Sequence, residues 1–304
     1  MCVIVEHDGR FRAYETDLKP AWGPLFDHVI PSELPAGRIV RWTRLGQKGD
    51  PNAWQEQLRL ATGLQHSTLP EKRATARSAY LYLLTDAIGL REDDVHDSTG
   101  GEAAPGKVSF NLDHRDSSAH AGVAGAIPSD RTTPLPEPTL EVGPRAFGDL
   151  IALRGTLLHE FTHLGHAVKT IEAVRRWRAT ERKLPFLAWL ERQRLDPVEH
   201  AIIAEQVTPH AESTESLAYL RGFTSSYHLY DLSAIPDDVV GDTKLFKELG
   251  YLAEEWPRAA HAVQDEVIEQ LVAYRDALPP DHQARFNAYV RGRRGGAGFW
   301  AKLS

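Results

Sequence analysis

The stretch Leu157-Leu158-His159-Glu160-Phe161-Thr162-His163 decides how this sequence is interpreted, because it contains the pattern H-E-x-x-H within a segment of helical periodicity. Residues four apart on a helix lie one turn apart on the same face, so His159 and His163 can direct ring nitrogens at one divalent ion. Glu160 lies beside them, where a carboxylate can take a proton from a zinc-activated water. The motif therefore predicts a zinc metallopeptidase with Glu160 as its general base.

The residues around the motif favour a helix with two stripes. Apolar side chains recur at helical spacing, and the histidines lie at an angle to them. The apolar stripe consists of Leu153, Leu157, Phe161, Leu164 and Val168, and the histidine stripe of His159, His163 and His166. This pattern is typical of a helix that forms the floor of a cleft. The alternative is a helix whose imidazoles are only solvated or hydrogen-bonded.

A catalytic zinc takes three protein ligands and keeps a fourth position for water, so the two histidines need a third donor. His166 is the nearest candidate, but at 1.5 Å rise per residue it lies about 10 Å from His159 along a continuous helix. A metzincin would have glycine in place of His166 and histidine in place of Lys169. We therefore expect His166 beside the site, and a carboxylate from a following helix as the third ligand.

The motif and the segment after it resemble the gluzincins, the thermolysin-like zinc metallopeptidases. In that family a downstream helix carries a glutamate ligand in a pattern close to N-E-x-x-S-D, which Thr214-Glu215-Ser216-Leu217-Ala218-Tyr219 matches loosely. The resemblance implies one zinc ion per chain, bound by His159, His163 and Glu215. Thr214 replaces the usual asparagine, and Tyr219 replaces the aspartate that orients a zinc-bound histidine, so the support of that histidine must differ here.

Glu212 lies one turn before Glu215 on nearly the same face and stays a rival for the third ligand. The alternative for both is an exposed acidic helix face. The resemblance covers only Arg154 to about Tyr230. This helix-rich, cysteine-poor chain is also similar to zinc peptidase domains of bacterial toxins and secretion-system effectors. That similarity implies a peptide or protein substrate and, for a toxin, an immunity or delivery partner.

Composition limits the class of protein. The 304 residues are 42% hydrophobic and 25% charged, as in soluble globular proteins, and a net charge of -7 gives no basic field for nucleic acid. Cys2 is the single cysteine, which excludes an internal disulfide and a cysteine-rich zinc site. Charge at Glu6 comes too early for a signal peptide, and no apolar run reaches about 18 residues. We expect a protein made in the cytoplasm without a membrane span; an effector delivered by a secretion system would look the same.

The predicted fold class is α+β, mainly helical and zincin-like, with the active-site cleft between two lobes. A small mixed N-terminal lobe is expected at 1–124, a proline-rich linker or flap at 125–144 and a helical zinc-binding lobe at 145–304. Strands are expected at 3–5, 38–40 and 108–112. Helices are expected at 52–61, 71–90, 171–194 with a break at Pro185, 198–230 with a break at 208–209, 246–278 with a break near Pro257, and 280–293. The 108–112 strand is either the edge strand that pairs with extended substrate in gluzincins or an ordinary internal strand.

Hydrolysis of a peptide bond develops an oxyanion, which a tyrosine or histidine donor can stabilise. The candidates near the proposed ligand are Tyr219, Tyr227, His228, Tyr230, His200 and His210. A packing role is the alternative for each, and the spacing selects none of them.

Two other function classes compete with a peptidase. Glu160-Phe161-Thr162-His163 is also the E-x-x-H motif of di-iron carboxylate bundles, but the second E-x-x-H that such a bundle needs is absent from the sequence. A non-catalytic zinc-binding regulatory or interaction module is the other class. An open coordination position and the presence of Glu160 argue against its closed structural site.

Overall fold

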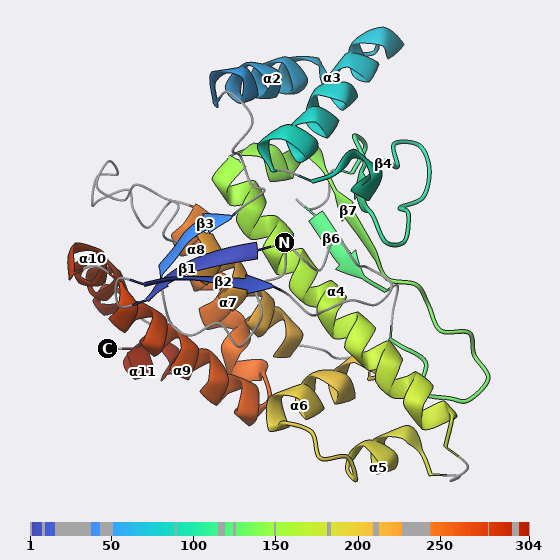
Figure 1. Cartoon of the computed structure of the whole chain (residues 1–304), viewed down its shortest axis with the longest axis vertical. Helices are drawn as coiled ribbons and strands as arrows, with labels where there is room; N and C mark the ends of the chain where they lie inside the picture. Colours follow the sequence, from blue (N-terminus) through green and yellow to red (C-terminus); the bar gives the residue numbers. More distant parts are fainter. Residues whose placement is uncertain are drawn as a thin grey trace. The chain divides into compact units, whose positions relative to one another are not determined.

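The structure is a computed structural model, drawn in Figure 1. It describes residues 2–7, 10–15, 38–42, 51–88, 90–114, 119–123, 126–148, 150–180, 184–208, 213–226, 244–278, 280–293 and 298–303. The described residues form an α+β fold that is mainly helical, which confirms the coarse fold class expected from the sequence.

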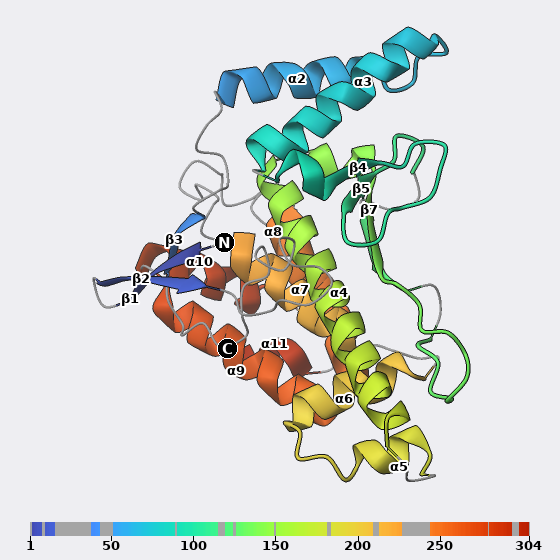
Figure 2. The same cartoon turned by 45° about the vertical axis from the view of Figure 1, so that its right-hand side comes forward.

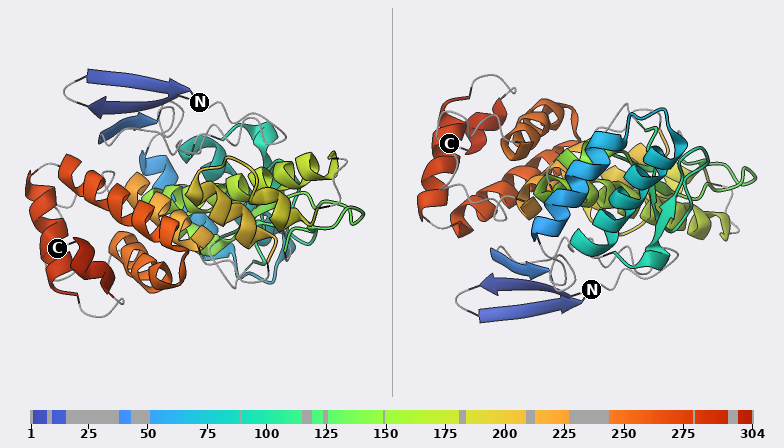
Figure 3. Two further views of the ribbon diagram at one scale, coloured as in Figure 1. Left: turned by 90° about the horizontal axis from the view of Figure 1, so that it is seen from below. Right: turned by 90° about the horizontal axis from the view of Figure 1, so that it is seen from above.

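Two small sheets are present in the described residues. The first has the order β2-β1-β3, from β1 (Cys2–His7), β2 (Arg10–Glu15) and β3 (Arg38–Trp42), with β1 and β2 antiparallel. Figure 3 shows this sheet from two sides. The second has the order β4-β5-β7-β6, from β4 (Val95–Asp97), β5 (Val108–Phe110), β6 (Ala119–Gly122) and β7 (Thr139–Val142). The strands predicted at 3–5, 38–40 and 108–112 are therefore confirmed as β1, β3 and β5.

Strand β5 is an internal strand, so its interpretation as a substrate-binding edge was wrong. It pairs in parallel with β4 on one side and β7 on the other, and the sheet edges are β4 and β6. Val108, Ser109 and Phe110 are all buried. The Ser109 hydroxyl accepts a hydrogen bond at 2.9 Å from the backbone N–H of Ala104, in the segment before β5, which gives this buried polar group a partner.

The first half of the chain also contains a helical pair. Helix α2 (Pro51–Leu64) and α3 (Pro70–Tyr82) lie side by side in Figures 1 and 2, and α3 continues into a π-helical turn, η1 (Leu83–Ala87). The 3-10 turns η2 (Glu92–Asp94) and η3 (Pro144–Gly148) precede β4 and follow β7. Tyr80, Phe110 and Phe147 pack ring against ring, with centroids 4.7 to 5.7 Å apart, and so connect α3, β5 and η3 through one aromatic core.

The remaining helices follow the predicted order. They are α4 (Leu150–Arg178), α5 (Phe186–Leu190), α6 (Pro197–Gln206), α7 (Ser213–Ser226), α8 (Lys244–Glu255), η7 (Trp256–Arg258), α9 (His261–Ala277), α10 (Pro280–Arg291) and α11 (Phe299–Leu303). The expected breaks near Pro185, Thr208 and Pro257 separate real elements. The largest difference is that α4 continues as a single helix to Arg178, so the helix expected from Ile171 is its last part. In addition, α5 ends at Leu190, before the expected 194, and α11 was not predicted.

The chain forms two compact units. One comprises Met1–Leu34, Ile39–Ala121 and Thr139–Phe161, and the other Pro35–Arg38, Gly122–Pro138 and Thr162–Ser304. The division falls within the continuous helix α4. The expected lobes at 1–124 and 145–304, with a cleft between them, stay predictions.

The proline-rich range 125–144 is not a loop throughout. It includes β7, whose Leu140 and Val142 are buried. Within 126–138, Ile127 is buried and its N–H donates to the Gln206 carbonyl at 2.9 Å. Arg178 donates to the carbonyls of Asp130 and Thr133, at 2.8 and 2.7 Å. These contacts connect the segment to α4 and α6; its predicted role as a linker or flap stays a prediction.

Among the described residues, no helix is both long enough and apolar enough to cross a membrane.

Candidate metal centre

Helix α4 places its apolar stripe in the interior. Leu153, Leu157, Phe161 and Leu164 are each at most 2% exposed, as their spacing predicted, whereas Val168 at the end of the predicted stripe is only partly buried. His159 and His163 are partly exposed and lie one turn apart. The buried stripe fixes the rotation of the helix, and that rotation keeps both imidazoles accessible.

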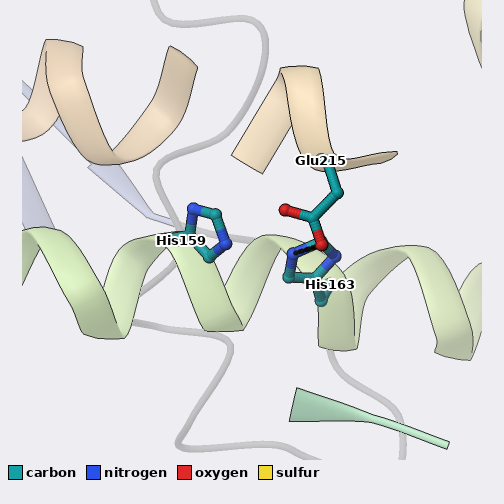
Figure 4. Close-up of side chains that lie close together, drawn as sticks. All are labelled: His159, His163 and Glu215. Carbon is teal, nitrogen blue, oxygen red and sulfur yellow. Dashed lines mark ion pairs between the residues drawn. The ribbon is translucent and has the colours of Figure 1, made fainter. Parts of the chain in front are cut away.

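Helix α7 supplies the carboxylate. Its first turn is closely packed, since Ser213, Thr214 and Ser216 are buried. Glu215 differs from them, with a side chain 41% exposed. Figure 4 shows this side chain extending from α7 toward the histidines of α4.

The three predicted ligands converge. One ligand atom from each of His159, His163 and Glu215 can be chosen so that all lie within 4.8 Å of one another. His163 Nε2 and Glu215 Oε1 are 3.4 Å apart. Ligands at about 2.0 to 2.2 Å from a tetrahedral zinc are separated by roughly 3.4 Å from each other, so small side-chain rotations suffice to bind an ion. This is the one such group of three or more His, Cys, Asp or Glu found among the described residues.

Glu160 directly follows His159 on α4 and is 7% exposed. It is not a member of the converging group, and its role as a base stays a prediction. The rival ligand Glu212 lies outside the described residues, so the choice between Glu215 and Glu212 stays a prediction.

His166 lies outside the converging group, as the helical rise predicted. Its Nδ1 is buried and has no hydrogen-bond partner in the described part of the chain. Burial, with the added effect of the positive charges expected at His163, Lys169 and Arg221, holds the pKa of His166 well below the usual 6.5. The imidazole is therefore neutral at neutral pH.

Tyr219 is the one described tyrosine among the oxyanion candidates. Its ring packs on Tyr251, with centroids 5.7 Å apart, against the core of α7 and α8. Burial and the negative charge of Glu215 raise the pKa of Tyr219, so the phenol keeps its proton and can donate it in a hydrogen bond. Tyr219 thus packs, as the alternative required, and still carries a donor on the helix of Glu215.

The other oxyanion candidates gain no support. His200 on α6 lies 3.4 Å from the Glu191 carboxylate and belongs to no metal-binding group of the described residues. Tyr227, His228, Tyr230 and His210 lie outside the described residues.

One contact was missed by the sequence reasoning. Glu205, near the end of α6, accepts hydrogen bonds from both the backbone N–H and the hydroxyl of Ser213, at the start of α7. A serine at the start of a helix is a recognisable N-terminal signal. The glutamate that bonds it stands eight positions earlier on another helix, where no local pattern marks it.

No protein-family model, curated protein or solved structure matches this chain. The interpretation of the site therefore depends on its own geometry and chemistry.

Proposed function

We propose that this chain is a zinc-dependent metallopeptidase of the zincin type, with His159, His163 and Glu215 as the metal ligands. The observation that carries the proposal is the convergence of these three side chains from two helices, with ligand atoms within 4.8 Å of one another. His159 and His163 share a motif and would be neighbours on any helix. Glu215 belongs to a distant part of the sequence, and its approach depends on the fold.

The donor set fits a catalytic zinc ion. Two imidazole nitrogens and one carboxylate oxygen are a known ligand set of zinc peptidases, and they leave one coordination position open. A structural zinc is normally closed by four protein ligands, and the described residues bring three together. When bound, zinc supplies Lewis-acid chemistry: it polarises the scissile carbonyl and lowers the pKa of water.

The remaining steps belong to residues of this chain. Glu160 accepts the proton of the attacking water and later delivers it to the leaving amine nitrogen. Tyr219, one turn after Glu215 on α7, keeps its hydroxyl proton and is our candidate donor to the oxyanion. A peptide or protein is the substrate that this set of roles requires.

The test combines metal analysis with a cleavage assay on a broad peptide library. The parent protein should contain about one zinc per chain and cut peptides, whereas His163→Ala should lose both properties. Glu172→Gln is the matched control, because Glu172 lies on the same helix outside the converging group. Bound iron in place of zinc would point to a di-iron protein, and zinc without turnover to a regulatory module; either result contradicts the proposal.

A further inference from the structure

The first turn of α7 must be held in place if Glu215 is to reach the metal. The Glu215 side chain is 41% exposed, and its Oε1 lies 3.4 Å from His163 Nε2. Its place depends on the backbone of the turn from Ser213 to Ser216. The first N–H groups of a helix have no partner within the helix, so this turn relies on bonds from elsewhere.

Glu205 accepts one of these N–H groups from α6 and also bonds the side chain of the same residue. One carboxylate oxygen, Oε2, accepts from the Ser213 backbone N–H at 2.9 Å, and the other, Oε1, accepts from the Ser213 hydroxyl. A carboxylate at the N-terminus of a helix also interacts favourably with the helix dipole. Glu205 therefore binds the start of α7 in two ways at once.

Ser213 connects this pair to a third helix. Its hydroxyl oxygen accepts a hydrogen bond from the backbone N–H of Ala260, at 2.8 Å, directly before α9 begins. Ser213 is fully buried. Water therefore has no access to replace either bond if one is lost, and the effect of losing one should pass to the backbone of the turn.

We propose that Glu205 is a positioning residue for the metal site, which acts through Ser213 to hold Glu215 at the distance where it can share an ion with His159 and His163. This inference rests on the proposed function, since it assigns Glu215 as a ligand. Glu205 itself touches neither metal nor substrate in this assignment. It determines how well the third ligand is preorganised.

The experiment measures zinc affinity and the visible absorption spectrum of the cobalt-substituted protein for Glu205→Gln and Ser213→Ala. Glutamine keeps the size of Glu205 but has one acceptor oxygen for two donors. We expect both variants to bind zinc about 10 to 100 times more weakly, the range typical of residues that orient a metal ligand. The cobalt spectrum should change as well, because it reports the ligand geometry and a general loss of stability would not alter it.

The controls separate positioning from charge and from folding. Glu199→Gln removes a carboxylate from the same helix, where Glu199 faces Lys169 at 4.0 Å, and should leave zinc affinity unchanged. Ser213→Ala changes no charge, so an equal loss of zinc affinity in this variant excludes a long-range electrostatic cause. If Glu205→Gln does not fold, Ser213→Ala alone provides the test. The two changes share one hydrogen bond, between the Ser213 hydroxyl and Glu205, so the loss of zinc affinity in the double variant should be smaller than the product of the two single losses.

The outcomes distinguish this inference from the proposed function. A parent protein that binds zinc through His163, together with unchanged affinity in Glu205→Gln and Ser213→Ala, overturns the positioning role alone. Losses that multiply in the double variant also overturn it. A parent protein that binds no zinc overturns the proposed function, and the positioning role with it.

Discussion

Replacement of Glu160 by glutamine should separate metal binding from turnover. Glutamine keeps the size and hydrogen-bonding reach of Glu160 but cannot accept a proton. General-base catalysis contributes roughly 10² to 10⁴-fold in rate, or about 3 to 5 kcal/mol of activation free energy at 1.36 kcal/mol per tenfold. Because Glu160 is only 7% exposed, bulk water does not readily replace it as a proton acceptor. We therefore expect kcat to fall near the upper end, by about 10⁴-fold.

Zinc binding should survive the same change. The converging ligand atoms come from His159, His163 and Glu215, so the zinc affinity of Glu160→Gln should stay within about threefold, well below the 10 to 100-fold loss expected when a supporting residue is removed. Turnover, zinc binding and folding can be measured on one preparation, by steady-state cleavage of a fluorogenic peptide, by zinc content and by thermal unfolding. Glu172→Gln is again the control. Turnover near the parental rate would refute the mechanism, and loss of zinc would show that Glu160 is a ligand, as in a di-iron site.

Three further predictions concern the site and its neighbour His166. His159→Ala should lose stoichiometric zinc in dialysis against buffered low free metal, and its retention would remove His159 from the ligand set. Glu215→Ala should abolish tight zinc binding while Glu212→Ala keeps most of it; the reverse order moves the ligand by one turn. The pKa of His166 is lower in the folded state than in the unfolded state, so below about pH 6.5 the unfolded chain binds the extra proton and acid favours unfolding. As the pH falls below this value, the free energy of unfolding of the metal-free protein, measured with urea, should decrease by up to about 1.4 kcal/mol per pH unit from this group. The decrease should be smaller in His166→Gln, and an equal decrease would contradict the assignment.

The metal helix could be predicted because two patterns agreed in one segment. The spacing of Leu153, Leu157 and Phe161 specified which face is buried, and the two histidines had to lie on another face. Its length was harder to predict. Charged residues after Ile171 resembled a new element, but Ala173, Val174 and Trp177 continue the buried face to the end of α4.

The strands show why the rest could not be predicted. Strand β7 follows Pro138 directly, and the many prolines before it favoured a loop. The strand itself has only four residues, which is too short for a recognisable strand pattern. Strand β5 alternates apolar and polar residues, which is typical of a half-buried strand. Ser109 is nevertheless fully buried, because Ala104 supplies its hydrogen bond from a neighbouring turn.

The approach of Glu215 to the histidines is only partly encoded in its local sequence. The pattern around Glu215 places this residue near the start of a helix. The start of that helix is bonded at Ser213 by Glu205, from α6, and by Ala260, the residue before α9. Such contacts between distant segments leave no periodic signal in the sequence.

The proposed ligands belong to separate helices, α4 and α7, and a metal ion bound to both would be a cross-link between distant points of the chain. A single cysteine excludes an internal disulfide, so the ion would take the place of that kind of covalent bond. Ligand bound only to the folded state adds about 2.7 kcal/mol of stability at a free concentration 100 times the Kd. Removal of zinc by a chelator should then lower the melting temperature as well as the activity. The fraction of folded protein would therefore depend on the free zinc concentration.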